Sequence, residues 1–376
     1  MANSEAAIAS HRRDSMKRAS LDGRTMIPTG RVVPAASEES ITLAAKVIRN
    51  GGLVAFPTET VYGLGCDALN PDAVARVFEA KQRPSFDPLI VHIATEASLD
   101  GLVQAISLAE HRLMERFWPG PLTLVLPKRA QVPDLVTAGL PTIAIRMPAH
   151  PVAQALIREA GVPIAAPSAN PFGYVSPTCA QHVLDGLGDR VDLILDGGPC
   201  PIGVESTIVS MIGARAELLR PGSVTLAEIR EVIGSAVQVA SSQTVVAPGQ
   251  LPRHYATRTP VTILSTREVR PIVQEHERVG LLAMLAPSQA DDRRCVIEVL
   301  SSSGDLREVA RNLFAALRRM DALSLDRLYA EPCDDRGLGL AIMDRLRRCA
   351  VSNQPKTSGP STAVATVLAE STRLTR

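Results

Sequence analysis

The sequence predicts an α/β protein with two domains, the first of them built on a mixed β-sheet. Short apolar runs alternate with amphipathic helical patterns from Glu38 to about Ile233. The composition then shifts to a segment rich in Pro, Ser and Thr, and a second alternation follows to about residue 350. A chain of 376 residues is also long for one hydrophobic core and sufficient for two.

The first domain is expected to span residues 36–235. Its predicted strands are the apolar runs at 53–56, 89–93, 122–127, 142–147, 163–168, 192–198 and 206–211. Its predicted helices lie at 39–51, 72–81, 109–118, 150–161 and 178–189. In the first helix Ile41, Ala44, Ala45 and Ile48 share one face, and Gly51 ends it.

The second domain is expected at 261–350, after a linker at 236–260 that has no helical periodicity. Its predicted strands lie at 261–265, 279–285 and 295–301, and its predicted helices at 305–323 and 337–350. The longer helix carries one apolar stripe, formed by Leu306, Val309, Leu313 and Leu317. Residues 1–35 and 351–376 are expected to be a disordered arm and a disordered tail.

The composition is that of an ordinary globular chain, and it excludes several classes of protein. The net charge of +1 argues against a strong general attraction to nucleic acid. Six scattered cysteines without a C-x-x-C pair predict neither a disulfide framework nor a metal site. No apolar run reaches membrane-spanning length, and the first 33 residues lack the apolar core of a secretory signal. Acidic residues in this arm also argue against a transit peptide, so a cytoplasmic location is expected.

Two polar loops flank the helix predicted at 72–81. Thr58, Glu59 and Thr60 precede it, and Lys81 and Arg83 stand at its end. Such cations and polar groups suit an anionic ligand that carries phosphate. The alternative is that the two cations only complement the helix dipole.

Arg146 and His92 lie inside predicted strands. Thr142 and Arg146 share the face opposite Ile143 and Ile145, so Arg146 points into solvent or a cleft. A guanidinium in a cleft can hold a carboxylate in a bidentate fork, whereas the alternative is an exposed arginine at a sheet edge. For His92, the alternative to a ligand contact is a core histidine whose hydrogen bonds are satisfied.

The sequence has no P-loop motif and no G-x-G-x-x-G after a strand, so a bound nucleotide needs another cradle. The best candidate is the turn-rich run APSANPFGYVSPT from Ala166, whose backbone N–H groups are suited to phosphate. Its candidate residues are Ser168, Asn170, Gly173, Ser176 and Thr178. The alternative is an ordinary proline-rich loop.

Several motifs together resemble the YrdC/Sua5 family. The family's run K-x-R-P-x-x-N-P-L-I-V-H appears as KQRPSFDPLIVH from Lys81 to His92. Further matching runs are FWPGPLTLVL from Phe117, TIAIRMPAHP from Thr142, APSANPFG from Ala166, GVESTIVS from Gly203, LRPGSVT from Leu219 and the linker-like APGQLPRHYATRTPV from Ala247. The resemblance covers about residues 36–350. It implies a YrdC-like twisted mixed sheet with flanking helices and a smaller, Rossmann-like α/β Sua5 domain at the C-terminus.

The resemblance also implies an activity and residue roles. Members of the family make threonylcarbamoyl-AMP and pyrophosphate from L-threonine, bicarbonate and ATP, for N6-threonylcarbamoyladenosine (t6A) at position 37 of tRNA. Phosphate charge would be balanced by Lys81 and Arg83, as the catalytic residues. The residues implied to bind threonine are Thr60, His92, Arg146, Ala166 and Ser206. Those implied to bind ATP are Arg83, Asp87, Thr142, Ser168, Ser176, Arg220 and Tyr255, the last of them in a linker that would act as a lid.

Two positions depart from the family's usual pattern. Phe86-Asp87 stands where the family usually has Asp-Asn, and a carboxylate there adds like charge beside phosphates unless magnesium bridges it. The loop after Asn170 reads Pro-Phe-Gly, whereas a small residue usually precedes the glycine. Both departures bear on nucleotide affinity.

The implied chemistry needs Mg²⁺ that arrives with ATP, and no organic cofactor, resident metal or protein nucleophile. The implied partner is the downstream tRNA threonylcarbamoyl transferase machinery, with weak RNA contact at most and no membrane. One alternative is a carbamoyl-transfer enzyme on the same fold, although the zinc fingers of hydrogenase-maturation proteins are absent from this sequence. The other is an RNA-binding module, which the net charge and the 3% aromatic content disfavour.

Overall fold

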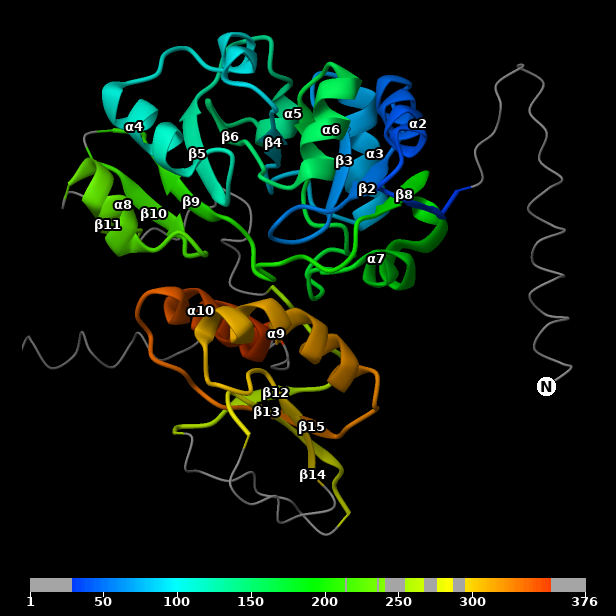
Figure 1. The fold of residues 1–376 in the computed structure, drawn as a ribbon, viewed down its shortest axis with the longest axis vertical. Helices are drawn as coiled ribbons and strands as arrows, with labels where there is room; N and C mark the ends of the chain where they lie inside the picture. Colours follow the sequence, from blue (N-terminus) through cyan, green and yellow to red (C-terminus); the bar gives the residue numbers. More distant parts are fainter. Residues whose placement is uncertain are drawn as a thin grey trace, which may run out of the picture.

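The computed structural model describes residues 29–213, 215–234, 237–240, 254–266, 276–286 and 295–352. Figure 1 shows two layered α/β parts, as the sequence predicts. Residues 1–28 of the expected arm, most of the expected linker and residues 353–376 of the expected tail lie outside the described residues.

A mixed sheet forms the centre of the first domain, with the strand order β1-β8-β2-β3-β7-β4-β6-β5-β9-β10-β11 among the described residues. Its strands are β1 (Arg31–Pro34), β2 (Val54–Phe56), β3 (Gly63–Asp67), β4 (Ile90–His92), β5 (Leu122–Pro127), β6 (Thr142–Arg146), β7 (Ile164–Ala165), β8 (Leu193–Asp196), β9 (Thr207–Ser210), β10 (Glu217–Arg220) and β11 (Gln238–Val239). In the middle of the sheet β4 runs parallel to β6, and β6 runs antiparallel to β5. The predicted mixed sheet is therefore confirmed.

Helices cover both faces of this sheet. They are α2 (Glu38–Arg49), α3 (Pro71–Lys81), α4 (Leu108–Phe117), α5 (Asp134–Thr137), α6 (Pro151–Ala160), α7 (Ala180–Leu187) and α8 (Leu226–Ile233). Alternation along β2 and the residue before it separates two core clusters, because Leu53 and Ala55 pack in one cluster with residues of α3 and α4 while Val54 and Phe56 pack in another with residues of α2 and α6.

Helix α3 begins and ends at residues suited to those positions. The Asn70 side chain accepts hydrogen bonds from the backbone N–H groups of Asp72 and Ala73, and Pro71 takes the first helical position. Gln82 ends the helix in a left-handed conformation with φ 53°, which turns the chain back toward the sheet.

The second domain has a four-stranded parallel sheet, ordered β12-β15-β13-β14. Its elements are β12 (Val261–Ile263), β13 (Val279–Ala283), β14 (Cys295–Val299), α9 (Leu306–Asp321), β15 (Arg327–Ala330) and α10 (Leu338–Ser352). In Figure 1 both helices lie between this sheet and the first domain. The all-parallel order agrees with the expected Rossmann-like unit.

Several boundaries and elements differ from the sequence-based expectation. The expected disordered arm to residue 35 is wrong at its end, because Arg31–Pro34 form β1 beside β8. The expected linker from 236 is wrong at its start, because Gln238–Val239 pair with β10. Strand β15 was not expected, although it lies between β12 and β13. Its sequence RLYA is too short to show strand alternation.

Among the described residues, no helix is both long enough and apolar enough to cross a membrane.

Candidate active site

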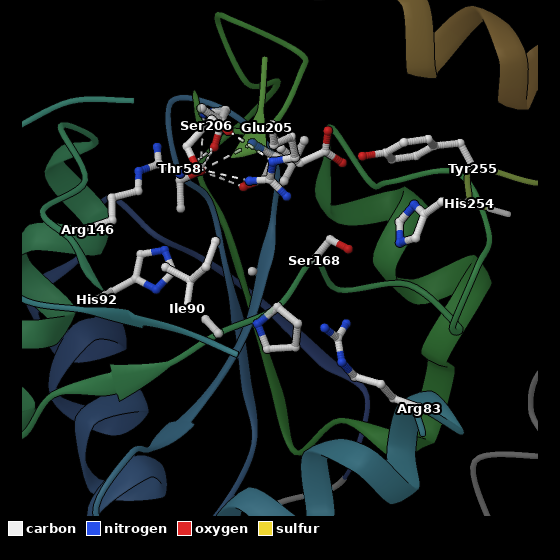
Figure 2. Close-up of a pocket in the computed structure, with 16 residues that line it drawn as sticks. Thr58, Arg83, Ile90, His92, Arg146, Ser168, Glu205, Ser206, His254 and Tyr255 are labelled. Atoms are coloured by element: carbon white, nitrogen blue, oxygen red, sulfur yellow. Dashed lines mark hydrogen bonds between the residues drawn. The ribbon is translucent and has the colours of Figure 1, made fainter. Parts of the chain in front are cut away.

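One cavity brings together most of the residues that the sequence singles out. It lies just after β2, at the ends of β6 and β10 and at the start of β9, beside β4 and the segment His254–Tyr255 of the expected linker (Figure 2). Its lining consists of Thr58, Thr60, Val61, Gly63, Arg83, Ile90, His92, Arg146, Ala166, Pro167, Ser168, Glu205, Ser206, Arg220, His254 and Tyr255.

Arg146 is buried in this cavity at the end of a central strand. Its Nη2 lies 2.6 Å from Glu59 Oε1, and its Nη1 donates to Thr60 Oγ1 at 2.9 Å. Its Nε donates to the carbonyl of Gly120 at 3.2 Å. Burial raises the pKa of Glu59, but the Arg146 guanidinium outweighs it and holds that pKa below its usual value. The alternative of an exposed edge arginine is therefore wrong.

His92 lies beside Arg146, because the two residues are paired in register across the parallel strands β4 and β6. Its ring is buried and meets the edge of Phe56 at a centroid distance of 6.1 Å. Burial and the nearby Arg146 charge lower the pKa of His92 to about 3, so the imidazole is neutral. Its Nδ1 has no hydrogen-bond partner among the described residues. That nitrogen is therefore available to a ligand, unlike one in a satisfied core histidine.

The loop after β2 is pre-organised by its own hydroxyl groups. Thr58 Oγ1 accepts from the backbone N–H of Thr60 and Val61 and donates to the Val61 carbonyl at 2.6 Å. It also lies 2.8 Å from Thr60 Oγ1. Because these bonds fix the loop, Thr60 faces Arg146 before any ligand arrives.

Ser206 and Arg220 are hydrogen-bonded to each other in the cavity lining. Arg220 Nε donates to the Ser206 carbonyl at 3.0 Å, and its Nη2 donates to Ser206 Oγ at 3.1 Å. Ser206 Oγ also lies 2.8 Å from Thr123 Oγ1 on β5. Burial lowers the pKa of Arg220 to about 10, so at neutral pH it is a cation held against the cavity.

Arg83 reaches the cavity from the loop after α3. Its Nη2 lies 2.9 Å from Asp87 Oδ2, and it also donates to the carbonyls of Asp87 and Pro88. Asp87 is fully buried and does not line the cavity. The carboxylate of Asp87, which the sequence predicts to add like charge beside phosphates, is therefore paired with the Arg83 cation. The neighbouring Phe86 is 59% exposed.

Lys81, Thr142 and Ser176 do not line the cavity either. Lys81 is buried, and its Nζ donates to the carbonyls of Ser168 and Asn170, so it holds the candidate nucleotide loop. Thr142 begins β6 opposite Pro127, at the other end of the strand from Arg146. Each of the three stays a predicted site residue, and each lies outside the cavity lining.

His254 and Tyr255 close one side of the cavity, as Figure 2 shows. Their ring centroids lie 4.2 Å apart, and Tyr255 stacks on Phe314 of α9 at 5.2 Å. Burial raises the pKa of Tyr255 far above its ordinary value, so its hydroxyl stays protonated. The described part of the expected lid thus lies between the second domain and the cavity.

The sequence alone predicts neither Glu205 nor His254 as a site residue, although both line the cavity. Each stands beside a residue that was expected there, Ser206 and Tyr255, and that adjacency was the available signal. Within the ranges that the structure describes, no group of three His, Cys, Asp or Glu side chains is placed to hold a metal ion.

Comparisons with known proteins agree with this architecture. Residues 46–222 match the family of Sua5, YciO and YrdC proteins described as "Telomere recombination", and residues 224–351 match "Threonylcarbamoyl-AMP synthase, C-terminal domain". The threonylcarbamoyl-AMP synthase of Pyrococcus abyssi is 45% identical over 324 residues, which cover 83% of this chain and 94% of that protein. The one of Bacillus subtilis is 44% identical over 325 residues, which cover 84% of this chain and 94% of that protein.

A solved structure shows the same fold. The crystal structure of P. abyssi Sua5 complexed with L-threonine superposes with a TM-score of 0.78 at 42% identity, over 86% of this chain and 98% of that one.

The two-domain α/β fold with a buried, arginine-lined cavity defines an ATP-using nucleotidyltransferase when taken with these relatives. This chain belongs to the Sua5 family of threonylcarbamoyl-AMP synthases.

Proposed function

We propose that the cavity binds L-threonine at its Arg146 end and magnesium-bound ATP at its Arg83 and Arg220 end, and joins them through bicarbonate. The observation that carries the proposal is that Arg146, Arg83 and Arg220 all line the same cavity. The P. abyssi relative, whose structure is described as a complex with L-threonine, supports the choice of amino acid.

The reaction has two steps. The threonine amine combines with bicarbonate and loses water, which gives a carbamate. A carbamate oxygen then attacks the α-phosphorus of ATP, and pyrophosphate leaves with the electrons of the broken P–O bond. An α-amino group has a pKa of about 8, so part of it is neutral at physiological pH without a strong base.

The residues at the Arg146 end hold threonine. Arg146 donates to its carboxylate while the ion pair with Glu59 fixes the guanidinium plane. The free Nδ1 of the neutral His92 and the hydroxyl of Thr60 are available to the polar groups of threonine. Ala166 and Ser206 complete the part of the lining that faces threonine, and Ser206 also accepts hydrogen bonds from Arg220 at the start of the phosphate-binding part.

The residues at the other end balance phosphate charge. Arg83 and Arg220 lie on the cavity wall, with Ser168 and Tyr255 near them. In-line displacement asks for positioning and charge stabilisation rather than a protein nucleophile. Mg²⁺ enters with ATP as part of the substrate. Because Arg83 pairs with Asp87, the Asp87 carboxylate adds little net negative charge to the site when no Mg²⁺ is bound.

The product is a mixed anhydride that hydrolyses readily, so it passes to the tRNA threonylcarbamoyl transferase machinery that completes t6A. Any RNA contact of this chain is weak, in line with a net charge of +1. The reaction belongs to the cytoplasm, where tRNA and ATP are available.

The test is pyrophosphate release by the purified protein with ATP, Mg²⁺ and bicarbonate, with and without L-threonine. Release should require both threonine and bicarbonate. Arg146→Ala should raise KM for threonine about 30-fold, because a hydrogen bond to a charged group is worth roughly 2 kcal/mol. Arg76→Ala, outside the cavity on α3, is the matched control and should behave as wild type.

Two outcomes would contradict the proposal. Turnover with carbamoyl phosphate or another amine, but not with threonine, would place the protein among carbamoyl-transfer enzymes. Absence of turnover together with salt-dependent RNA binding would favour a binding module.

A further inference from the structure

Arg345 on α10 is buried to an extent that is unusual for an arginine, and it reaches across the domain interface. Its side chain is 0% exposed, and its Nε lies 3.1 Å from Glu205 Oε2. Its Nη1 donates to the carbonyl of Pro221 at 2.5 Å and to Asp344 Oδ2 at 3.2 Å. Both Glu205 and Pro221 belong to the first domain, so Arg345 connects the second domain to the wall of the cavity.

The partner of Arg345 is Glu205, whose carboxylate would lack this counter-charge at the substrate site if Arg345 were absent. Glu205 lines the cavity and accepts a hydrogen bond of 2.5 Å from Ser176 Oγ. Burial raises its pKa, but Arg345 and then Arg220 outweigh that effect and bring the pKa of Glu205 down to about 2. The cavity therefore carries a carboxylate anion close to Arg220, where the triphosphate is proposed to bind.

An unpaired carboxylate at this place would repel a nucleotide. Taking a charge out of water is costly unless a partner compensates it, and a bound triphosphate would add further negative charge. Arg345 supplies the compensating charge from outside the cavity lining. Its guanidinium also lies 5.8 Å from the ring centroid of Tyr255, which lines the same cavity.

We propose that Arg345 is a positioning residue of the nucleotide site, which neutralises and orients Glu205 so that ATP meets a hydrogen-bonded ion pair and not a bare carboxylate. The second domain thereby contributes to substrate binding. This inference rests on the proposed function of the cavity.

Other contacts hold the interface independently of Arg345, and they make its role separable. Tyr174 donates to Asp321 on α9 at 2.6 Å, and Arg318 donates to the carbonyl of Val175. The loop of Tyr174 and Val175 is thus attached to α9, not to α10. Loss of Arg345 should therefore change the charge beside the cavity while these interface contacts remain.

A double-mutant cycle tests the proposal. The variants are Arg345→Met, which keeps the length of the side chain, Glu205→Gln, and both together. Arg347→Met is the matched control, because Arg347 lies on the same helix with 51% of its side chain exposed and pairs with the exposed Asp335. KM and kcat for ATP are measured by pyrophosphate release, and the Kd of α,β-methylene-ATP by calorimetry.

Arg345→Met should raise both KM and Kd about tenfold or more, with a smaller change in kcat. The double variant should lie within about threefold of Glu205→Gln alone, because removing the carboxylate removes the need for its counter-charge. Arg347→Met should match wild type. Arg345→Lys, which keeps the charge but loses the fork, should fall between wild type and Arg345→Met.

Two results would overturn the inference. If the double variant is impaired as strongly as Arg345→Met, the arginine acts on the fold and not through Glu205. If Arg345→Met binds the analogue as tightly as Arg347→Met, Arg345 has no role in the site. Should Arg345→Met not fold, Arg345→Lys with and without Glu205→Gln decides the same question. A wild-type protein that makes no threonylcarbamoyl-AMP would instead refute the proposed function.

Discussion

At the scale of single residues, the site is a set of buried charges, and most of them are already paired. Arg83 pairs with Asp87, Arg146 with Glu59 and Arg345 with Glu205. Each pairing leaves the guanidinium oriented, so that little rearrangement is needed when an anion binds. The same burial keeps His92 neutral.

The state of His92 predicts how stability depends on pH. Its pKa of about 3 in the folded protein lies below the ordinary value of 6.5, so its contribution is complete above pH 6.5 and is lost as pH falls toward 3. At pH 5 the loss from this one group is about 2 kcal/mol. Glu205, with a pKa of about 2, loses its contribution only below its ordinary pKa of 4.5, outside this window.

His92→Asn should therefore reduce the decrease in unfolding free energy between pH 7 and pH 5 by about 2 kcal/mol. Urea unfolding at the two pH values measures this. His111→Asn, on the exposed surface of α4, is the control and should keep the wild-type decrease. An unchanged decrease in His92→Asn would show that His92 is not kept neutral by burial.

At the scale of elements, the end of α3 is attached to the candidate nucleotide loop. The helix ends at Lys81, whose Nζ donates to the carbonyls of Ser168 and Asn170. The alternative of mere dipole complementation is wrong for Lys81, because its partners lie in another loop. Burial lowers the pKa of Lys81 well below its ordinary value, and the carbonyls compensate part of that cost.

Lys81→Met should destabilise the protein by about 2–4 kcal/mol, because two buried carbonyls lose their donor. It should also raise KM for ATP, since the loop that carries Ser168 is no longer held. Lys46→Met, at an exposed position of α2, is the control. A large fall in kcat without a loss of stability would instead mean that Lys81 contacts the reacting phosphates directly.

At the scale of the whole molecule, the two domains share a continuous core. Val61, Val175 and Val204 of the first domain pack in one cluster with Phe314 of α9 and Leu346 of α10. The loop before β9 approaches α9 closely at a glycine. A Cβ at Gly203 would lie 2.4 Å from Arg311 Cα, and the backbone there has φ +84°.

Gly203→Ala should therefore push α9 away and weaken ATP binding as well as stability. We expect a loss of more than about 3 kcal/mol, since backbone atoms on both sides must move. Gly198→Ala is a close control, because Gly198 has φ +79° but nothing within 4 Å of the added Cβ. Thermal unfolding and KM for ATP are compared. Equal effects of the two substitutions would mean that backbone strain alone, and not domain packing, explains the loss.

The sequence by itself determined the two-domain α/β fold, the family and most of the cavity lining. The apolar periodicity that predicts each element is a local property of the sequence and does not depend on tertiary packing. The motif from Lys81 to His92 keeps the site residues at fixed spacing. Elements with little periodicity, such as β1, β11 and β15, could not be predicted because neighbouring strands define them.

Only the tertiary structure decided which side chains meet. Lys81 and Asp87 lie inside the motif, yet they turn away from the cavity wall to bond a loop and an arginine. Arg345 lies 140 residues from Glu205 in the chain, and local pattern carries no information about such a pair. Burial, charge compensation and domain packing depend on contacts across the whole chain, and these placed the second domain against the site.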